Sequence, residues 1–315
     1  MRTTHRSDKN IMTTAAADAP AFDYTTRIFG DEAIIDPRGP SWASVRMRRC
    51  LASLAEVRGQ VLEVGCGAGR CIRTIRHQRP DLAAFGCDLS DRAIETARGH
   101  RDGVRYEVAD ALDLPYEDGR FDAVVVMDLL EHVPDVPGLL GEVRRVLRPG
   151  GRLHLHVPCE GAGWSLYRPL LAVGVDLTRA AVGHVHHFTP VEVVGHLEAA
   201  AFRVLRIRRS MYWFQQAHDL ITWWGMLRRG RTGDPAETAL SGKPGIGADP
   251  VPGGFRWKHL LSRPAWWVAR TFLPRLQTAE QCLLGWQPIG SIGLCVTADS
   301  DPDTRRDSDP GRPCR

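Results

Sequence analysis

The sequence lacks the features that would place the chain across a membrane or outside the cell. It has no uninterrupted run of about 18 apolar residues, and its first twenty positions lack the apolar core of a secretory signal. Its eight cysteines include no C-x-x-C pair, which gives no support for a disulfide framework. The net charge of +4 is small for 315 residues and gives no global sign of nucleic-acid binding. We therefore expect a cytoplasmic protein with reduced thiols.

A glycine-rich turn follows the first expected strand. Residues 61–64, apolar except for Glu63, are typical of a buried strand, and Gly65, Gly67 and Gly69 then alternate along the chain before a helical pattern begins. Such a turn lets a nucleotide-like ligand approach the backbone, although it can also serve only to pack a helix closely on a sheet. Arg70 occupies the sixth position, where the dinucleotide pattern G-x-G-x-x-G needs glycine, so a pyrophosphate ligand is disfavoured.

Beyond this turn, short apolar segments alternate with helices of about ten residues, which predicts a doubly wound α/β sheet. We expect Ser90 and Thr189 to cap two of the helices. The further expected strands are Leu82–Cys87, Val104–Val108, Phe121–Met127, Arg152–Val157, Arg203–Arg209 and Ser291–Ala298. The expected helices are Trp42–Val57, one from the glycine turn to Pro80, Asp91–Arg98, Pro137–Leu147, Trp164–Val182 and one that begins at Pro190.

Acidic residues follow three of these strands. Asp88 lies about twenty positions after the glycine turn, where a carboxylate can accept hydrogen bonds from both ribose hydroxyls of an adenosyl ligand. A simple helix cap is the alternative role for Asp88. Asp110 ends the next strand, where it can accept a hydrogen bond from an adenine amino group, and Asp128 ends the one after. Ligands bind at the carboxyl ends of parallel strands, so we expect these side chains to line one site.

Four motifs in register resemble the type 11 family of class I S-adenosylmethionine-dependent methyltransferases, which includes the C- and O-methyltransferases of ubiquinone and menaquinone biosynthesis. The motifs are VLEVGCGAGR, GCDLS, VADALDLPYEDGRFDAVVVMDLLEHVPD and LRPGGRLHLHVP, and the resemblance covers Phe22–Arg209 plus the last strand. It implies a Rossmann-like, mostly parallel seven-stranded sheet with S-adenosylmethionine as cofactor. The implied reaction is methyl transfer to an O, N or C atom of a small-molecule or lipid-like acceptor. A non-catalytic cofactor-binding scaffold or regulator is the alternative, and a nucleotide-dependent oxidoreductase is disfavoured by the glycine spacing.

The resemblance also implies a role for each residue at the strand ends. Glu63 and the glycine turn would hold the methionine end of the cofactor, Asp88 the ribose, and Asp128 with Leu129 the region of the sulfonium. Leu89 would lie against the adenine, which Asp110 and Ala111 would flank. The cofactor-binding set is Glu63, Gly65, Cys66, Gly67, Gly69, Asp88, Leu89, Asp110, Ala111, Asp128 and Leu129.

Histidines supply candidates for a general base. His132 follows the fourth strand, and His184 lies in the segment GHVHHFTP with His186 and His187, where a histidine can also serve only to pack the loop. We select His132 and His184 as catalytic candidates. His154 and His156 alternate along a strand and are expected to be partly exposed structural residues. No H-x-x-x-H or cysteine pairing supports a metal site, so we predict no metal.

The segment Met211–Gly290 departs from the regular alternation. Residues 203–275 hold thirteen Lys or Arg against four Asp or Glu, and residues 203–290 hold seven of the nine tryptophans. One helical face is expected to carry apolar residues, with Gln216, Asp219 and Thr222 elsewhere on the helix. Three interpretations remain open: a helical cap over the substrate pocket, a surface through 211–275 that contacts the inner face of a membrane or a lipid acceptor, and a nucleic-acid surface, which is the least favoured.

These patterns predict five parts of the chain. Residues 1–20 and 299–315 are expected to be disordered tails, because neither has apolar groups to bury. Residues 21–210 form the methyltransferase core, 211–290 the helical insertion, and 291–298 the last core strand. We also hold Tyr24 and Trp42 as candidates for the acceptor pocket.

Overall fold

The computed structural model describes residues 28–230, 279, 280, 283 and 290–300. The expectations for the tail 1–20, for Tyr24 and for most of the insertion beyond residue 230 lie outside the described residues. The five-part division of the chain stays a prediction. It differs from the structure at one boundary, because Asp299 and Ser300, assigned to the C-terminal tail, belong to the last strand.

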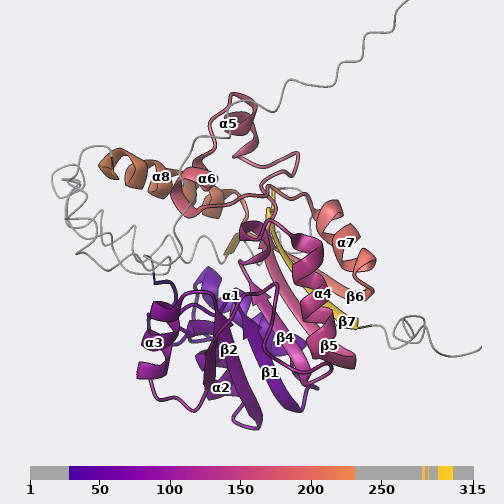
Figure 1. The fold of residues 1–315 in the computed structure, drawn as a ribbon. Helices are drawn as coiled ribbons and strands as arrows, with labels where there is room; N and C mark the ends of the chain where they lie inside the picture. The colour runs from indigo at the N-terminus through magenta and orange to yellow at the C-terminus, as the bar shows by residue number, and fades with distance from the viewer. Residues whose placement is uncertain (1–27, 231–278, 281–282, 284–289, 301–315) are drawn as a thin grey trace, which may run out of the picture.

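Seven strands form one mixed sheet in the order β3-β2-β1-β4-β5-β7-β6 (Figure 1). The first five strands in this order run parallel, and β7 runs antiparallel to both β5 and β6. This confirms the predicted, mostly parallel doubly wound sheet. The strands are β1 Gly59–Val64, β2 Leu82–Asp88, β3 Arg105–Val108, β4 Phe121–Met127, β5 Leu147–Pro158, β6 Phe202–Ser210 and β7 Gly293–Ser300.

Helices cover both faces of the sheet because successive strand side chains point to opposite sides. In β4, Ala123 and Val125 pack with apolar residues of α1, α2 and α3, whereas Val124 and Val126 pack with those of α4 and α7. The helices are α1 Trp42–Ser53, α2 Arg70–Gln78, α3 Asp91–Gly99, α4 Val136–Val146, α5 Arg168–Ala172, α6 Leu177–Val182, α7 Pro190–Ala199 and α8 Trp213–Gly230, with a short 3-10 turn η1 Leu130–His132.

Both predicted helix caps are present. The Ser90 side chain accepts a hydrogen bond from the Ala93 amide at the start of α3. Thr189 begins α7 with a reciprocal capping box, in which its side chain pairs with the backbone of Glu192 and the Glu192 side chain returns to Thr189. Sequence-local hydrogen bonds therefore define these two helix starts.

The helix expected over Trp164–Val182 is wrong, because the structure has two short helices in its place. Gly174 lies between α5 and α6 with a φ of 79°, in the left-handed region that interrupts an α-helix. Asp176 then caps α6 by accepting from the Arg179 amide at 2.9 Å. A second difference concerns β5, which is expected over Arg152–Val157 but begins at Leu147 and ends at Pro158, so it includes Pro149, Gly150 and Gly151.

Helix α8 follows β6 and so begins at the same edge of the sheet as the carboxyl end of β5, because β6 and β5 both run antiparallel to β7. It packs on α6 beyond that edge (Figure 1). On this helix Gln215, Gln216, Asp219 and Trp223 are buried, whereas Trp213 and Ile221 are exposed. The buried side of this part of the helix therefore combines polar residues with an aromatic one. Within the described residues, no helix is long and apolar enough to span a bilayer.

Candidate functional site

The turn between β1 and α2 packs tightly against its own protein. Gly65, Gly67 and Gly69 all have positive φ values, of 73°, 53° and 85°. A Cβ atom at Gly65 would approach Leu129 to 2.9 Å, one at Gly69 would approach the Tyr106 hydroxyl to 2.5 Å, and one at Gly67 would collide with the carbonyl of Phe29. Close packing, the alternative explanation of the turn, therefore accounts for these glycines whether or not a ligand is bound.

Asp88 connects this turn to the end of β2. Its carboxylate accepts from the Gly67 amide at 2.8 Å through Oδ2 and from the Ser90 amide at 2.9 Å through Oδ1. Burial raises the pKa of Asp88, and the two amide hydrogen bonds oppose that rise. Each carboxylate oxygen has a second lone pair, so Asp88 keeps the capacity to accept from ligand hydroxyls. Leu89 beside it is 61% exposed, which leaves an apolar surface next to the carboxylate.

Glu63 lies beneath the first turn of α2. It is buried, and its Oε2 accepts from the Ile72 amide at 2.8 Å. Burial raises the pKa of Glu63 to about 8. The observed contact of Glu63 is therefore with the helix N-terminus that follows the glycine turn. Cys66, in the turn itself, is buried, and its amide donates to the Cys87 carbonyl at 2.9 Å.

Asp110 and Ala111 follow β3. Asp110 is exposed, and its Oδ1 accepts from the Leu112 amide at 2.9 Å. Ala111 is half-buried and packs against the apolar core that covers one face of the sheet. Both residues lie next to β2, because β3 and β2 are neighbouring parallel strands.

Asp128 ends β4 in a strained backbone conformation and takes part in a partly buried polar network. Its φ is 51°, unusual for a residue other than glycine. Its carboxylate forms an ion pair with Arg46 of α1 and accepts from His156 Nδ1 of β5 at 2.6 Å. Burial opposes ionisation, but these two partners outweigh it and hold the pKa of Asp128 well below its usual range. Nε2 of His156 lies 3.2 Å from the Ser210 hydroxyl, which extends the network to β6.

A second polar cluster lies just beyond Asp128 and contains both catalytic candidates. The rings of His132 and His184 pack edge to face with centroids 4.8 Å apart. Glu131 and Glu160 are fully buried beside them, and Glu160 Oε1 lies 2.8 Å from His184 Nδ1. Burial lowers the pKa of His132 to about 4 and opposes charge on His184, but Glu160 and Glu131 raise the pKa of His184 to about 9. Burial also raises the pKa of Glu131 to about 8.

The other histidines lie apart from this cluster. His186 Nε2 is 3.1 Å from the Val133 carbonyl, and His187 Nε2 is 2.9 Å from the Thr178 hydroxyl. The expectation that His154 and His156 are partly exposed is wrong, since both are fully buried. Their strand β5 lies between β4 and β7, with α4 packed on one face and α1 also in contact, so little of it reaches solvent.

Three residues of these networks are not among the site residues predicted from the sequence: Arg46, Glu131 and Glu160. Glu131 and His132 are neighbours in the quoted motif, so the acidic residue could have been selected with the histidine. Arg46 lies 82 positions before its partner Asp128, and Glu160 lies 24 positions before His184. No local pattern indicates either pairing.

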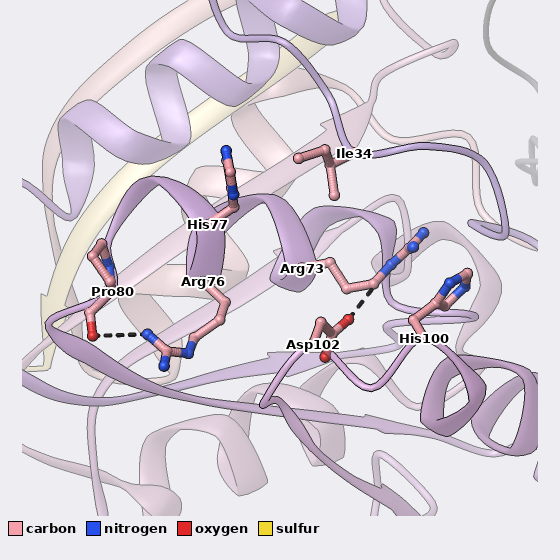
Figure 2. Close-up of a pocket in the computed structure, with 7 residues that line it drawn as sticks. All are labelled: Ile34, Arg73, Arg76, His77, Pro80, His100 and Asp102. Atoms are coloured by element: carbon pink, nitrogen blue, oxygen red, sulfur yellow. Dashed lines mark hydrogen bonds and ion pairs between the residues drawn. The ribbon is translucent and has the colours of Figure 1, made fainter.

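A surface pocket lies away from the predicted site, beside α2 and the segment after α3 (Figure 2). Arg73 and Asp102 form an ion pair at 3.9 Å across it, and Arg76 donates to the Pro80 carbonyl at 2.7 Å. No residue of the predicted cofactor set lines this pocket, so the pocket is separate from the predicted site. The lining residues are Ile34, Arg73, Arg76, His77, Pro80, His100 and Asp102.

Comparison with known proteins gives a consistent family. Residues 62–155 match a family described as a methyltransferase domain. The chain is 36% identical over 182 residues to a ubiquinone biosynthesis O-methyltransferase of Xanthomonas oryzae, a match that covers 53% of this chain and 72% of the relative. It is 37% identical over 122 residues to the 27-O-demethylrifamycin SV methyltransferase of Amycolatopsis mediterranei, covering 36% of this chain and 44% of the relative. The chain thus spans about half the length of the first curated relatives it matches.

Solved structures share the fold at low sequence identity. A putative methyltransferase from Bacillus halodurans superposes with a TM-score of 0.50 at 16% identity, over 82% of this chain and 99% of that one. The [4+2]-cyclase SpnF superposes with the same TM-score at 19% identity, over 85% of each chain. A cyclase on this fold illustrates that the fold alone does not determine the reaction.

Proposed function

We infer that this protein transfers a methyl group from S-adenosylmethionine to a small-molecule or lipid-like acceptor, because the chain belongs to the type 11 family of class I S-adenosylmethionine-dependent methyltransferases. The observation that carries the proposal is the position of Asp88. Its carboxylate lies at the carboxyl end of β2 and is bonded to the glycine turn, with an exposed Leu89 beside it. A carboxylate next to an apolar surface suits the ribose and purine of an adenosyl ligand.

The acidic, apolar and glycine residues at the strand ends fit the cofactor. We propose that Asp88 accepts from the ribose hydroxyls and that Leu89, Asp110 and Ala111 surround the adenine. The glycine turn would hold the methionine end, with Glu63 acting through the first turn of α2, to which it is bonded. The cofactor supplies an electrophilic methyl group on a sulfonium. The protein's part is to align the acceptor with that carbon and to exclude water.

Asp128 and Leu129 are proposed to border the sulfonium. Arg46 pairs with Asp128, so the positive charge of the cofactor would meet a carboxylate that is already held in place and partly neutralised. We therefore propose that the Asp128 network orients the cofactor more than it attracts the positive charge of its sulfonium. The catalytic roles expected of His132 and His184 stay predictions.

The acceptor class is proposed from the relatives and from α8. Two relatives are named for ubiquinone biosynthesis and for a demethylated rifamycin. We propose that residues 211–290 form a cap whose first helix, α8, lies beyond the carboxyl edge of the sheet. The test is to incubate the purified chain with S-adenosylmethionine and either a prenylated catechol or its tail-free analogue, and to measure S-adenosylhomocysteine. Faster release with the prenylated compound supports a lipid-like acceptor, whereas release with neither compound argues against catechol acceptors.

A peripheral membrane contact is favoured by one further observation. Trp213, Phe214 and Ile221 on α8 are 45%, 49% and 64% exposed, and aromatic and aliphatic side chains near basic residues are typical of interfacial helices. We propose that this face lies on an anionic bilayer. The protein should float with anionic vesicles, and a W213S/F214S/I221S variant should not. The matched control is Val191→Ser, which removes an exposed apolar residue from α7 and should leave flotation unchanged. Wild-type protein that stays in the aqueous fraction at low salt would contradict the proposal.

A further inference from the structure

Glu131 is a buried carboxylate whose oxygens have no hydrogen-bond partner among the described residues. It is 0% exposed, and neither Oε1 nor Oε2 forms a hydrogen bond. Burying an ionisable carboxyl without a partner is costly, so such a group indicates that something else balances it. The nearest cationic or ligating groups are the imidazoles of His132 and His184, whose Nε2 atoms each lie 3.9 Å from Glu131 Oε1.

The two imidazoles are oriented with Nε2 toward this carboxylate. His184 Nδ1 lies 2.8 Å from Glu160 Oε1, and His132 Nδ1 lies 3.4 Å from the Gly183 carbonyl. A carbonyl and an ionised carboxylate only accept, so in each neutral ring the proton belongs on Nδ1 and the Nε2 lone pair points into the cluster. Histidines that bind metals have this arrangement, with one nitrogen held by a carboxylate or carbonyl and the other directed at the ion.

The distances between the possible ligand atoms of this cluster fit a single cation. One ligating atom from each of Glu131, His132 and His184 lies within 4.8 Å of the other two. Bonds of about 2.0–2.2 Å to a tetrahedral ion would place such atoms about 3.4 Å apart, so they need to move together by only about an ångström. A divalent ion would also balance the two buried carboxylates, Glu131 and Glu160.

We propose that Glu131, His132 and His184 bind one divalent transition-metal ion, of the class that zinc and cobalt represent. Glu160 and the Gly183 carbonyl orient the two imidazoles. The ion connects two segments, the turn η1 after β4 and the segment after α6, and Glu160 links His184 to the segment after β5. The site gives both histidines a ligand role in place of a general-base role. It is independent of methyl transfer, and it contradicts the expectation from sequence spacing that the protein binds no metal.

The sequence does not predict this site because the three ligands do not form a short motif. Glu131 and His132 are adjacent, whereas His184 lies more than fifty positions later and is brought back by hydrogen bonds from the Val185 and His186 amides to the Glu131 carbonyl, of 2.9 and 3.2 Å. This backbone pairing fixes the GHVHHF segment against η1.

The test is titration of the chelator-treated full chain with Co²⁺, followed by visible absorption, and with Zn²⁺, followed by the change in Tm. We expect one equivalent of Co²⁺ to give the absorption of a nitrogen- and oxygen-ligated site, and Zn²⁺ to raise Tm. His132→Asn, at a partly exposed side chain, and Glu131→Gln should abolish both signals. Glu160→Gln should weaken binding about 10- to 100-fold, since it removes an orienting partner. His187→Asn, in the same segment but bonded to Thr178, is the control and should bind normally.

Circular dichroism of each variant shows whether it folds, and His132→Asn is the variant least costly to folding. Absence of binding to the wild-type protein at micromolar Co²⁺ and Zn²⁺ would overturn the proposal. So would equal binding by wild type and a folded His132→Asn variant, because the ion would then be bound elsewhere on the chain.

Discussion

Two carboxyl groups, those of Glu63 and Asp128, are expected to make the stability of this protein depend on pH in opposite directions. Glu63 has a pKa raised to about 8 by burial, whereas an unfolded glutamate titrates near 4.5. At pH values between about 4.5 and about 8, Glu63 keeps its proton in the folded chain and has lost it in the unfolded chain. Stability contributed by this group therefore falls as pH rises from about 4.5 to about 8, at a rate of up to about 1.4 kcal/mol per pH unit.

Glu63→Gln should remove this dependence while it keeps an oxygen acceptor for the Ile72 amide. We expect the free energy of unfolding of the variant, relative to wild type, to increase as pH rises through that window. Chemical denaturation at several pH values measures the difference. A difference that stays constant between pH 5 and pH 8 would show that Glu63 titrates normally.

Arg46 and Asp128 provide the opposite case, a carboxylate held ionised. Their ion pair contributes stability that is present above about pH 4 and lost as the pH falls below that value, because the folded pKa of Asp128 is depressed. The Asp128 side chain is 40% exposed, which moderates the effect. We expect Arg46→Met and Asp128→Asn to be coupled by about 0.5–3 kcal/mol in a double-mutant cycle at pH 7. Additive effects of the two substitutions would contradict a direct interaction.

At the scale of elements, helix α7 depends on its cap. Thr189 and Glu192 satisfy each other's backbone groups at the helix start. Thr189→Ala should lower the free energy of unfolding by about 1 kcal/mol. The control is Thr96→Ala in α3, where the hydroxyl donates to the Arg92 carbonyl of its own helix at 2.9 Å. Alanine is a better helix former than threonine, so stability should change by less than about 0.5 kcal/mol. Equal losses for the two variants would contradict the importance of the cap.

Elements that the sequence predicts well are those determined by local chemistry. Phe121–Met127 is almost wholly apolar because β4 is covered on both faces. Ser90 and Thr189 indicate helix starts through their own side chains. The helix predicted over Trp164–Val182 is wrong because apolar residues continue on both sides of Gly174, whose left-handed conformation interrupts the helix.

The residues of the candidate site also divide into those that local sequence predicts and those that it does not. Asp88 and Asp128 follow from their positions at strand ends, since parallel strands place their carboxyl ends at one edge. Their partners do not follow, because Arg46 on α1 and Glu160 after β5 reach the site only through tertiary packing. The burial of His154 and His156 also depends on where β5 lies within the finished sheet.

At the scale of the whole molecule, a doubly wound sheet brings the ends of β1 to β4 to one edge, and the segments after β5 and β6 extend beyond the same edge. The central claim is that this edge binds S-adenosylmethionine through Asp88. Ligand binding should also stabilise the folded chain, because the unfolded chain has no such site. A rise in Tm with S-adenosylmethionine, and none with NAD, is therefore expected; equal effects of the two ligands would contradict the cofactor assignment.

The most direct measurement is calorimetric titration with S-adenosylmethionine of wild type, Asp88→Asn and the control Asp91→Asn, an exposed acidic residue at the start of α3. Asparagine keeps one oxygen acceptor at position 88, so the turn can retain part of its bonding. We expect micromolar binding by wild type and the control, and binding at least tenfold weaker in Asp88→Asn, a loss of about 1.4 kcal/mol or more. No binding by wild type, or equal affinity in the folded Asp88→Asn variant, would contradict the account.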